Sequence, residues 1–185
     1  MKIVAISGSL RAKSSNAAVL RAAAARAPAG MQVVIFEGIG ALPHFNPDLD
    51  AEGAEPPPAV KEFRALLASA DGFVISSPEY AFGVPGALKD ALDWIVSSGE
   101  LRGKPIVLIN ASPTGGDHAR EALIRTLTVM EGRLLPEASL QTPFVRKMLG
   151  PDGDVADPTF LRRIEGSMIA LGAAVSAGDP GDPSP

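Results

Sequence analysis

The organising stretch of this sequence is a polar loop near the N-terminus, Ser7-Gly8-Ser9-Leu10-Arg11-Ala12-Lys13-Ser14-Ser15-Asn16. It follows the apolar run 3–6 and precedes the alanine-rich run 17–27, so we expect a strand, a turn and a helix. At the start of a helix the first backbone N–H groups have no intrahelical partner, and the helix dipole adds partial positive charge. The loop therefore predicts either an anion site or a plain turn with a serine cap.

The side chains of this loop favour a phosphate. Ser9 and Ser15 offer hydroxyls, Asn16 offers an amide, and Arg11 offers a planar guanidinium that can hold two phosphate oxygens at once. The dinucleotide motif Gly-x-Gly-x-x-Gly is absent because the loop has a single glycine, although Glu37 supplies an acid after the second predicted strand. We therefore expect the phosphate of a mononucleotide rather than a pyrophosphate.

The bulk composition limits the function classes. The chain has 185 residues, 46% of them hydrophobic and 21% charged, which suits one compact domain. The net charge is −4 and the basic residues are scattered, so we expect no nucleic-acid partner. The absence of cysteine excludes disulfides and thiolate chemistry, and we expect no metal site. No apolar run has the length of a membrane span, so we expect a cytoplasmic protein.

Strand and helix patterns alternate along the chain. Short apolar runs predict strands at 3–6, 32–36, 72–76, 105–110 and, interrupted by Pro136, 134–140. Helical spacing of apolar residues follows at 17–27, 60–70, 88–95, beyond a predicted cap at Asp117, and at 160–171. This order predicts an open, doubly wound parallel sheet covered by helices on both faces. We expect one domain over residues 1–175, with a proline-rich surface loop at 39–58, and a disordered tail over 176–185.

Three loops follow the carboxyl ends of predicted strands, at residues 7–16, 77–86 and 111–116. In a doubly wound sheet, ligands bind beyond these ends, where the strand order reverses. One loop is of the phosphate type, the second is aromatic and acidic, and the third is rich in glycine. The sequence therefore predicts that the three loops form one ligand site. Phe82 and Trp94 are expected in the core or at an interface.

Two motifs in these loops resemble those of the NADPH-dependent FMN reductases, a family that includes chromate, azo and quinone reductases. The first motif is Gly8-Ser9-Leu10-Arg11 with Ser15 and Asn16. The second is Ser77-Pro78-Glu79-Tyr80, followed by Pro85-Gly86-Ala87-Leu88-Lys89-Asp90-Ala91-Leu92-Asp93-Trp94. The similarity extends in order and spacing over roughly residues 1–175. It implies a flavodoxin-like three-layer αβα sandwich with a five-stranded parallel sheet.

The resemblance also implies a function. FMN would be the cofactor, and NADPH or NADH would reduce it by hydride transfer. The two electrons would then pass to quinones or similar small acceptors, such as free flavin, azo compounds or chromate. A homodimer or homotetramer is expected. The alternative is a flavodoxin-like electron carrier or a flavin-binding module without turnover, which steady consumption of NAD(P)H would separate from a reductase.

The site residues implied by the resemblance fall into three groups. The FMN phosphate would be held by Ser9, Arg11, Ser15 and Asn16. The isoalloxazine ring would lie along the backbone of Pro78, Glu79, Tyr80 and the adjoining Ala81, and the site would be completed by Ser112, Thr114, Gly115 and Gly116. Many members have Asn where this chain has Ala81, and losing one hydrogen bond there would cost on the order of 1 kcal/mol. No catalytic side chain is expected, because flavin itself carries the chemistry.

Overall fold

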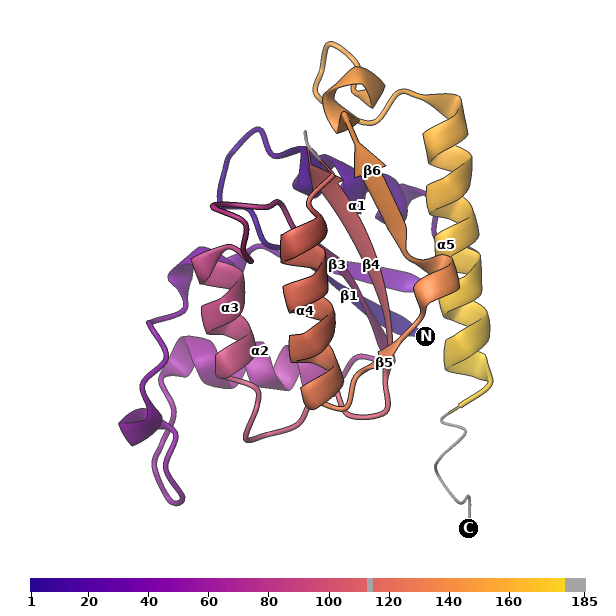
Figure 1. Ribbon diagram of the computed structural model, residues 1–185. Coiled ribbons are helices and arrows are strands. Elements are labelled where there is room, and N and C mark those ends of the chain that lie inside the picture. The colour runs from indigo at the N-terminus through magenta and orange to yellow at the C-terminus, as the bar shows by residue number, and fades with distance from the viewer. Residues whose placement is uncertain (113–114, 179–185) are drawn as a thin grey trace.

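The computed structural model describes residues 1–112 and 115–178. Figure 1 shows a twisted sheet between two layers of helices. The strands are β1 (Lys2–Ser7), β2 (Gln32–Phe36), β3 (Gly72–Ser76), β4 (Pro105–Ser112), β5 (Arg133–Leu134) and β6 (Leu140–Pro143). The α-helices are α1 (Ser15–Ala25), α2 (Pro58–Ala68), α3 (Gly86–Asp93), α4 (Asp117–Val129) and α5 (Pro158–Ser176).

The sheet is parallel throughout the described strands, with the order β2-β1-β3-β4-β5 and with β6 also paired to β4. The chain moves outward from β1 to β2 and then crosses back to β3 on the other side of β1. The strand order therefore reverses between β1 and β3. This is the flavodoxin-like order, in which a ligand crevice opens above the reversal.

The predicted fifth strand is divided into two. Pro136 begins a short 3-10 turn, Pro136–Ala138, between β5 and β6. Proline has no N–H to donate to a ladder, so a continuous strand cannot pass through this position. Both parts still pair with β4, β5 at its amino end and β6 along Ile109–Ser112. The edge of the sheet thus reaches the carboxyl end of β4, where the site lies.

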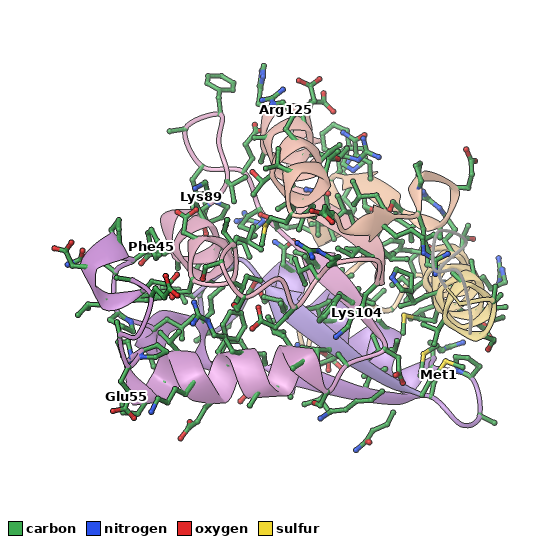
Figure 2. The ribbon with its side chains drawn as sticks, turned by 90° about the horizontal axis from the view of Figure 1, so that it is seen from below. Met1, Phe45, Glu55, Lys89, Lys104 and Arg125 are labelled. Carbon is green, nitrogen blue, oxygen red and sulfur yellow. The ribbon has the colours of Figure 1, made fainter. Side chains whose placement is uncertain are left out.

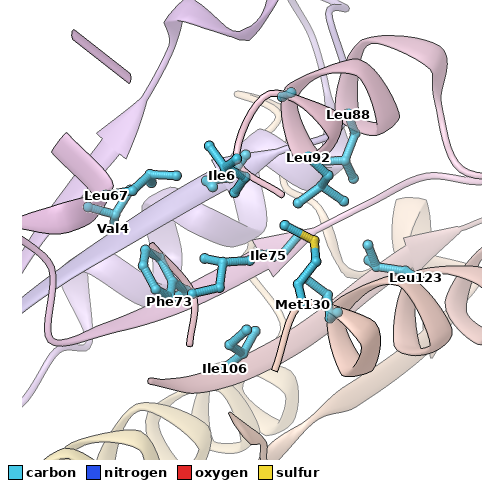
Figure 3. Close-up of a cluster of buried hydrophobic side chains, with 14 of the residues drawn as sticks. Val4, Ile6, Leu67, Phe73, Ile75, Leu88, Leu92, Ile106, Leu123 and Met130 are labelled. Carbon is cyan, nitrogen blue, oxygen red and sulfur yellow. The ribbon is translucent and has the colours of Figure 1, made fainter. Parts of the chain in front are cut away.

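Each face of the sheet has its own hydrophobic core, because side chains alternate along buried parallel strands. Val4, Ile6 and Ile75 point to the face covered by α2, α3 and α4, which contribute Leu67, Leu88 and Leu123 (Figure 3). Ile3, Ala5 and Val74 point to the opposite face, where α1 and α5 pack. Seen from below, side chains fill the space between the sheet and its helices (Figure 2).

Several expectations about individual residues are settled. Trp94 is fully buried, as expected for a core residue. Phe82 is 75% exposed, so of the two places predicted for it the core is excluded, and an interface stays a prediction. The prediction that Asp117 caps a helix is also wrong. Gly116 occupies the N-cap of α4, with a φ of 76°, and Asp117 is the first helical residue. A backbone at positive φ suits glycine, so the cap falls one residue earlier.

The long loop at 39–58 is a surface segment that hydrogen bonds and an ion pair hold against α2 and the end of α3. It contains two short 3-10 turns, Gly38–Ala41 and Pro47–Leu49. The indole N–H of Trp94 donates to the Pro43 carbonyl at 2.7 Å, and Arg64 pairs with Asp50 at 2.7 Å. At the other end of the chain, α5 continues to Ser176, so the predicted tail begins inside the helix, and residues 179–185 lie outside the described residues.

Candidate functional site

Loop one, residues 8–14, joins β1 to α1 and has the shape expected of an anion site. Its first turn is closed by serine hydroxyls: the Ser9 N–H donates to Ser7 Oγ at 3.2 Å, and the Arg11 N–H donates to Ser9 Oγ at 3.4 Å. Ser14 caps α1, since its Oγ accepts from the Ala17 N–H at 3.3 Å. The N–H groups of the two residues between them, Ser15 and Asn16, begin the helix and have no intrahelical acceptor there.

Asn16 has a different role from the one expected for its side chain. Its amide is buried and donates to the Ala111 carbonyl at 3.1 Å. Its Oδ1 accepts from Ser76 Oγ at 2.9 Å and from the Ala111 N–H at 3.3 Å. These bonds tie the start of α1 to β3 and β4. Asn16 therefore fixes the helix N-terminus against the sheet, and what it presents to the site is its backbone N–H.

A cavity of about 150 Å³ opens above the start of α1. It is lined from loop one by Ser9 and Arg11, and from the segment after β6 by Arg146. Within the described chain, neither arginine forms an ion pair with a carboxylate. Two guanidinium groups and a helix N-terminus therefore face one small cavity with their positive charge uncompensated.

Loop two, residues 77–85, borders the same cavity through Pro78, Glu79 and Tyr80. Its tip is a two-residue turn in which Tyr80 and Gly83 exchange both backbone hydrogen bonds, at 3.1 and 2.9 Å. The central residues Ala81 and Phe82 both have positive φ, 48° and 58°. Turns of this type normally carry Asn, Asp or Gly there, because a Cβ is unfavourable in the left-handed region.

The backbone geometry explains why many other members have Asn at the position of Ala81. Asparagine tolerates the left-handed conformation better than alanine does, so the Asn of other members suits this turn whatever its side chain contacts. Ala81 is exposed at the tip of the turn and does not line the cavity. The Tyr80 N–H and carbonyl are used within the turn, so its phenol ring, 48% exposed, is the part of Tyr80 open to a ligand.

Loop three joins β4 to α4 and is represented here by Gly115 and Gly116, since Thr114 lies outside the described residues. Both glycines have positive φ, and a Cβ on Gly116 would lie 3.1 Å from the Ser112 Cβ. Gln141 of β6 supports the loop, donating to the Gly115 carbonyl at 3.3 Å and to Asp117. Of the two described glycines of loop three, Gly116 therefore packs closely against the end of β4.

Glu79 connects loop two to the start of α4, which directly follows loop three. Its Oε2 accepts from the Ala119 N–H at 2.9 Å, at the third residue of α4. A carboxylate at a helix N-terminus is favoured both by this hydrogen bond and by the helix dipole. Glu79 is thus not a free surface carboxylate, because it holds loop two against the start of α4.

The structure brings together most of the predicted site residues. The 150 Å³ cavity is lined by Ser9, Arg11, Ser15, Asn16, Pro78, Glu79 and Tyr80. Ala81, Ser112, Gly115 and Gly116 do not line it. Among the other lining residues, Ser14 and Ala111 belong to the predicted loops, while sequence reasoning missed Val145 and Arg146. The basic pair Arg146-Lys147 was a signal for the last, but the strand before it is interrupted, which hid its position at the carboxyl edge.

The donor set fits a phosphate monoester. Hydroxyls, helix N–H groups and two unpaired arginines are acceptor-seeking groups, and together they match the several oxygens and the charge of a phosphate dianion. Among the residues that the structure covers, no group of three or more His, Cys, Asp or Glu side chains is arranged to hold a metal ion. No helix in that same part of the chain is long and apolar enough to cross a membrane.

Comparison with known proteins gives consistent matches. The family model for NADPH-dependent FMN reductase matches residues 1–146. The chain is 31% identical over 175 residues to an NAD(P)H-dependent FMN reductase of Pseudomonas aeruginosa, covering 92% of this chain and 93% of the relative. It is 30% identical over 177 residues to a quinone reductase of Escherichia coli, covering 93% and 94%.

The fold has a close counterpart among solved structures. The flavoenzyme FerB of Paracoccus denitrificans, an NAD(P)H:(acceptor) oxidoreductase, superposes with a TM-score of 0.83 over 96% of this chain and 98% of that chain. The two sequences are 24% identical, so this comparison supports the fold.

Proposed function

Because this chain belongs to the NADPH-dependent FMN reductase family, we propose that loops one, two and three together form its FMN site. The chain is an NAD(P)H-driven flavin oxidoreductase. The observation that carries the site assignment is the 150 Å³ cavity in which Arg11 and Arg146 face the start of α1. It lies above the β1/β3 reversal, where this strand order places ligands.

The phosphate of FMN would be held at the end of the site nearest α1. Ser9 and Ser15 contribute hydroxyls, and Ser15 and Asn16 contribute helix N–H groups. Arg11 and Arg146, which both line the cavity, contribute charge-assisted hydrogen bonds. Arg146 joins the phosphate site on the geometry alone, while the other residues were expected from the loop-one motif.

The flavin ring would lie toward loops two and three. Pro78, Glu79, Tyr80 and Ala81 border it on one side, and Ser112, Thr114, Gly115 and Gly116 complete it. The restraint between these loops supports this proposal, because Glu79 joins loop two to α4 and Gln141 braces loop three. Two loops fixed relative to each other can orient a planar ring without a hydrogen bond from every residue.

Bound FMN supplies the redox chemistry, accepting hydride from NAD(P)H and passing two electrons to a small acceptor. The protein binds and orients the cofactor, and no acid–base side chain is needed. Quinones are the proposed acceptors, supported by relatives named quinone reductase. Free flavin, azo compounds and chromate belong to the same proposal as other small acceptors.

We further propose that the protein works in the cytoplasm as a homodimer or homotetramer. Exposed apolar side chains support an assembly. Val129, at the end of α4, is 81% exposed, and Val96, just beyond α3, is 57% exposed. Sedimentation equilibrium of the purified protein would give the number of copies. A monomer at every concentration measured would contradict the assembly and leave the flavin site unaffected.

A flavin titration tests the site assignment. The protein stripped of flavin should bind FMN at least about tenfold more tightly than riboflavin, because riboflavin lacks the phosphate that loop one holds. Flavin fluorescence measures both affinities. Equal affinities would contradict the phosphate site. Steady oxidation of NADPH or NADH with a quinone then separates a reductase from the alternative, an electron carrier or flavin-binding module without turnover.

A further inference from the structure

A second cavity, of about 450 Å³, lies on the other side of loop one from the phosphate site. It opens between the start of α1 and the segment that follows β2. Its walls include apolar side chains and three charged ones: Leu10, Ile35, Ile39, Arg11, Arg21 and Glu37. A cavity of this size that is largely apolar, with a few polar groups, is typical of a small-molecule site. It shares Ser9 and Arg11 with the 150 Å³ cavity, and its other lining residues have no part in the proposed flavin site.

Glu37 stands at the carboxyl end of β2 and carries a carboxylate that is open to a ligand. It directly follows Phe36, the last residue of the strand, and its side chain makes no cap hydrogen bond to the turn that begins there. Within the described chain it forms no ion pair. In dinucleotide-binding sheets an acid at the end of the second strand accepts hydrogen bonds from the ribose hydroxyls of adenosine. Glu37 occupies that position without the glycine-rich turn of such folds.

The close approach of loop one to the β2 segment encloses this cavity. Leu10, 63% exposed, rests on the backbone of Gly40, and a Cβ on Gly40 would lie 3.0 Å from Leu10 Cδ2. Glycine at this position therefore lets the two segments meet. Loop one thus separates the two cavities, and Arg11 lines both of them.

We propose that this 450 Å³ cavity binds the adenosine half of the nicotinamide dinucleotide, with Glu37 accepting hydrogen bonds from the adenine-ribose hydroxyls. The inference rests on the proposed function. A carboxylate at the ribose repels a 2′-phosphate, so Glu37 favours the unphosphorylated dinucleotide over its 2′-phosphorylated form. Of the two cations in the walls, Arg21 is already paired with Asp154, at 2.9 Å from its Nε. Arg11 is assigned to the FMN phosphate, so the discrimination between the two dinucleotides rests on Glu37.

The spacing of the strands agrees with this assignment. The cavity lies above β2 and β1, while loops two and three follow β3 and β4. Neighbouring strands are about 4.8 Å apart, so the two places are separated by roughly 10 Å across the sheet. An extended dinucleotide is longer than this. Its adenosine can occupy the cavity while its nicotinamide reaches the loops that border the flavin ring.

Binding of the oxidised dinucleotides to FMN-loaded protein tests the inference without turnover. Isothermal titration calorimetry should give a lower Kd for NAD⁺ than for NADP⁺. Glu37→Gln should shrink the ratio of the NADP⁺ and NAD⁺ dissociation constants by about fivefold, because the neutral amide does not repel the 2′-phosphate. The matched control is Glu62→Gln, which neutralises an exposed carboxylate on α2 and should leave the ratio unchanged.

A second variant tests the cavity itself. Ala41→Trp places a large ring in its wall and should weaken NAD⁺ and NADP⁺ alike by about tenfold or more, while the Kd for FMN stays the same. Tighter binding of NADP⁺ by the wild type, an unchanged ratio in Glu37→Gln, or unchanged affinities in Ala41→Trp would each overturn the proposal. Failure of the proposed function would show earlier and separately, as failure of the wild type to bind FMN.

Discussion

Loop one and loop two leave the sheet at neighbouring strands, yet they keep their shapes by different means. Loop one is closed by its own hydroxyls, with Ser7 and Ser9 accepting from backbone N–H groups within the loop. No residue of loop one, all of which is described, has a positive φ. Loop two instead holds Ala81 and Phe82 at positive φ. Hydroxyl groups of its own sequence therefore close the first loop without positive φ, whereas the second combines a turn at positive φ with a hydrogen bond from α4 to Glu79.

The difference between the two loops shows that the unfavourable backbone conformations lie in loop two. A non-glycine residue in the left-handed region costs roughly 1–2 kcal/mol, and loop two has two such residues in succession. It withstands this cost because Glu79 is bonded to α4, and Tyr80 and Gly83 close the turn. Loop one, the proposed phosphate end of the site, is therefore relaxed, and loop two, the proposed ring end, is a strained turn held by these bonds. Four sets of substitutions test this difference between the two loops.

The largest effect is expected at the base of loop one. Asn16→Ala removes the acceptor of Ser76 Oγ and of the Ala111 N–H, and the donor to the Ala111 carbonyl, all of them buried. Leaving these groups unpaired should lower the free energy of unfolding by on the order of 3 kcal/mol, measured by urea denaturation. Ser15→Ala, the control next to it, should change stability by no more than about 0.5 kcal/mol. A small effect of Asn16→Ala would mean that loop one needs no tie to the sheet.

The second measurement separates binding from stability in loop one. Arg11→Ala should weaken FMN binding by roughly 1.5 to 3 kcal/mol, or about 10- to 150-fold, because a charge-assisted contact is lost. The free energy of unfolding without FMN should stay unchanged, since Arg11 is exposed. Lys13→Ala removes a cation from the same loop but outside the 150 Å³ cavity, and should change the FMN affinity less than about threefold. Equal losses in both variants would point to general charge rather than a built site.

The third measurement compares the same substitution in the two loops. Ala81→Gly relieves a left-handed alanine and should raise the free energy of unfolding by about 0.5–1 kcal/mol, after the flexibility of glycine is allowed for. Ala12→Gly in loop one, where φ is not positive, should lower it by about 0.5 kcal/mol. Thermal denaturation gives both values. The same sign in both loops would remove the distinction between a relaxed and a strained loop.

The smallest change in stability is expected at the hydrogen bond that joins loop two to α4. Glu79→Gln keeps an acceptor for the Ala119 N–H but loses the charge that interacts with the helix dipole. It should reduce stability by about 0.3–1 kcal/mol at low salt and less at high salt. Glu79→Ala, which removes the acceptor as well, should cost more. If the two variants were equally stable, the hydrogen bond to α4 would contribute nothing to the restraint of loop two.

Sequence reasoning reached the fold because its signals are local and repeated. Short apolar runs such as 72–76 identify strands buried on both faces, and helical stripes between them imply parallel crossovers. The phosphate loop was predictable for the same reason, since its hydroxyls, arginine and helix start are adjacent in sequence. The predicted ring side stays a proposal for Ala81, Ser112, Gly115 and Gly116, because sequence spacing does not show which of them faces a ligand.

Contacts between distant segments could not be predicted in this way. Arg146 reaches the phosphate cavity because β6 resumes pairing with β4 after Pro136, and a broken strand gives a weak pattern. Glu79 had the appearance of a loop carboxylate, but the start of α4 lies beside it in space, 40 residues further along the chain. Phe82 had the composition of a core residue, but the left-handed turn directs it outward.

The parallel sheet and its two helix layers could be predicted from the sequence alone, as could the loop at the start of α1 with the groups of an anion site. Each of these follows from periodicity or from groups that are neighbours along the chain, so no long-range contact has to be known. The packing of the chain was needed to see that the Asn16 amide faces the sheet, that Arg146 lines the proposed phosphate cavity, and that Glu37 and Gly40 border a second one. The positions of these side chains depend on which segments pack together. Burial and hydrogen bonds between distant segments, rather than residue type, decide where each side chain lies.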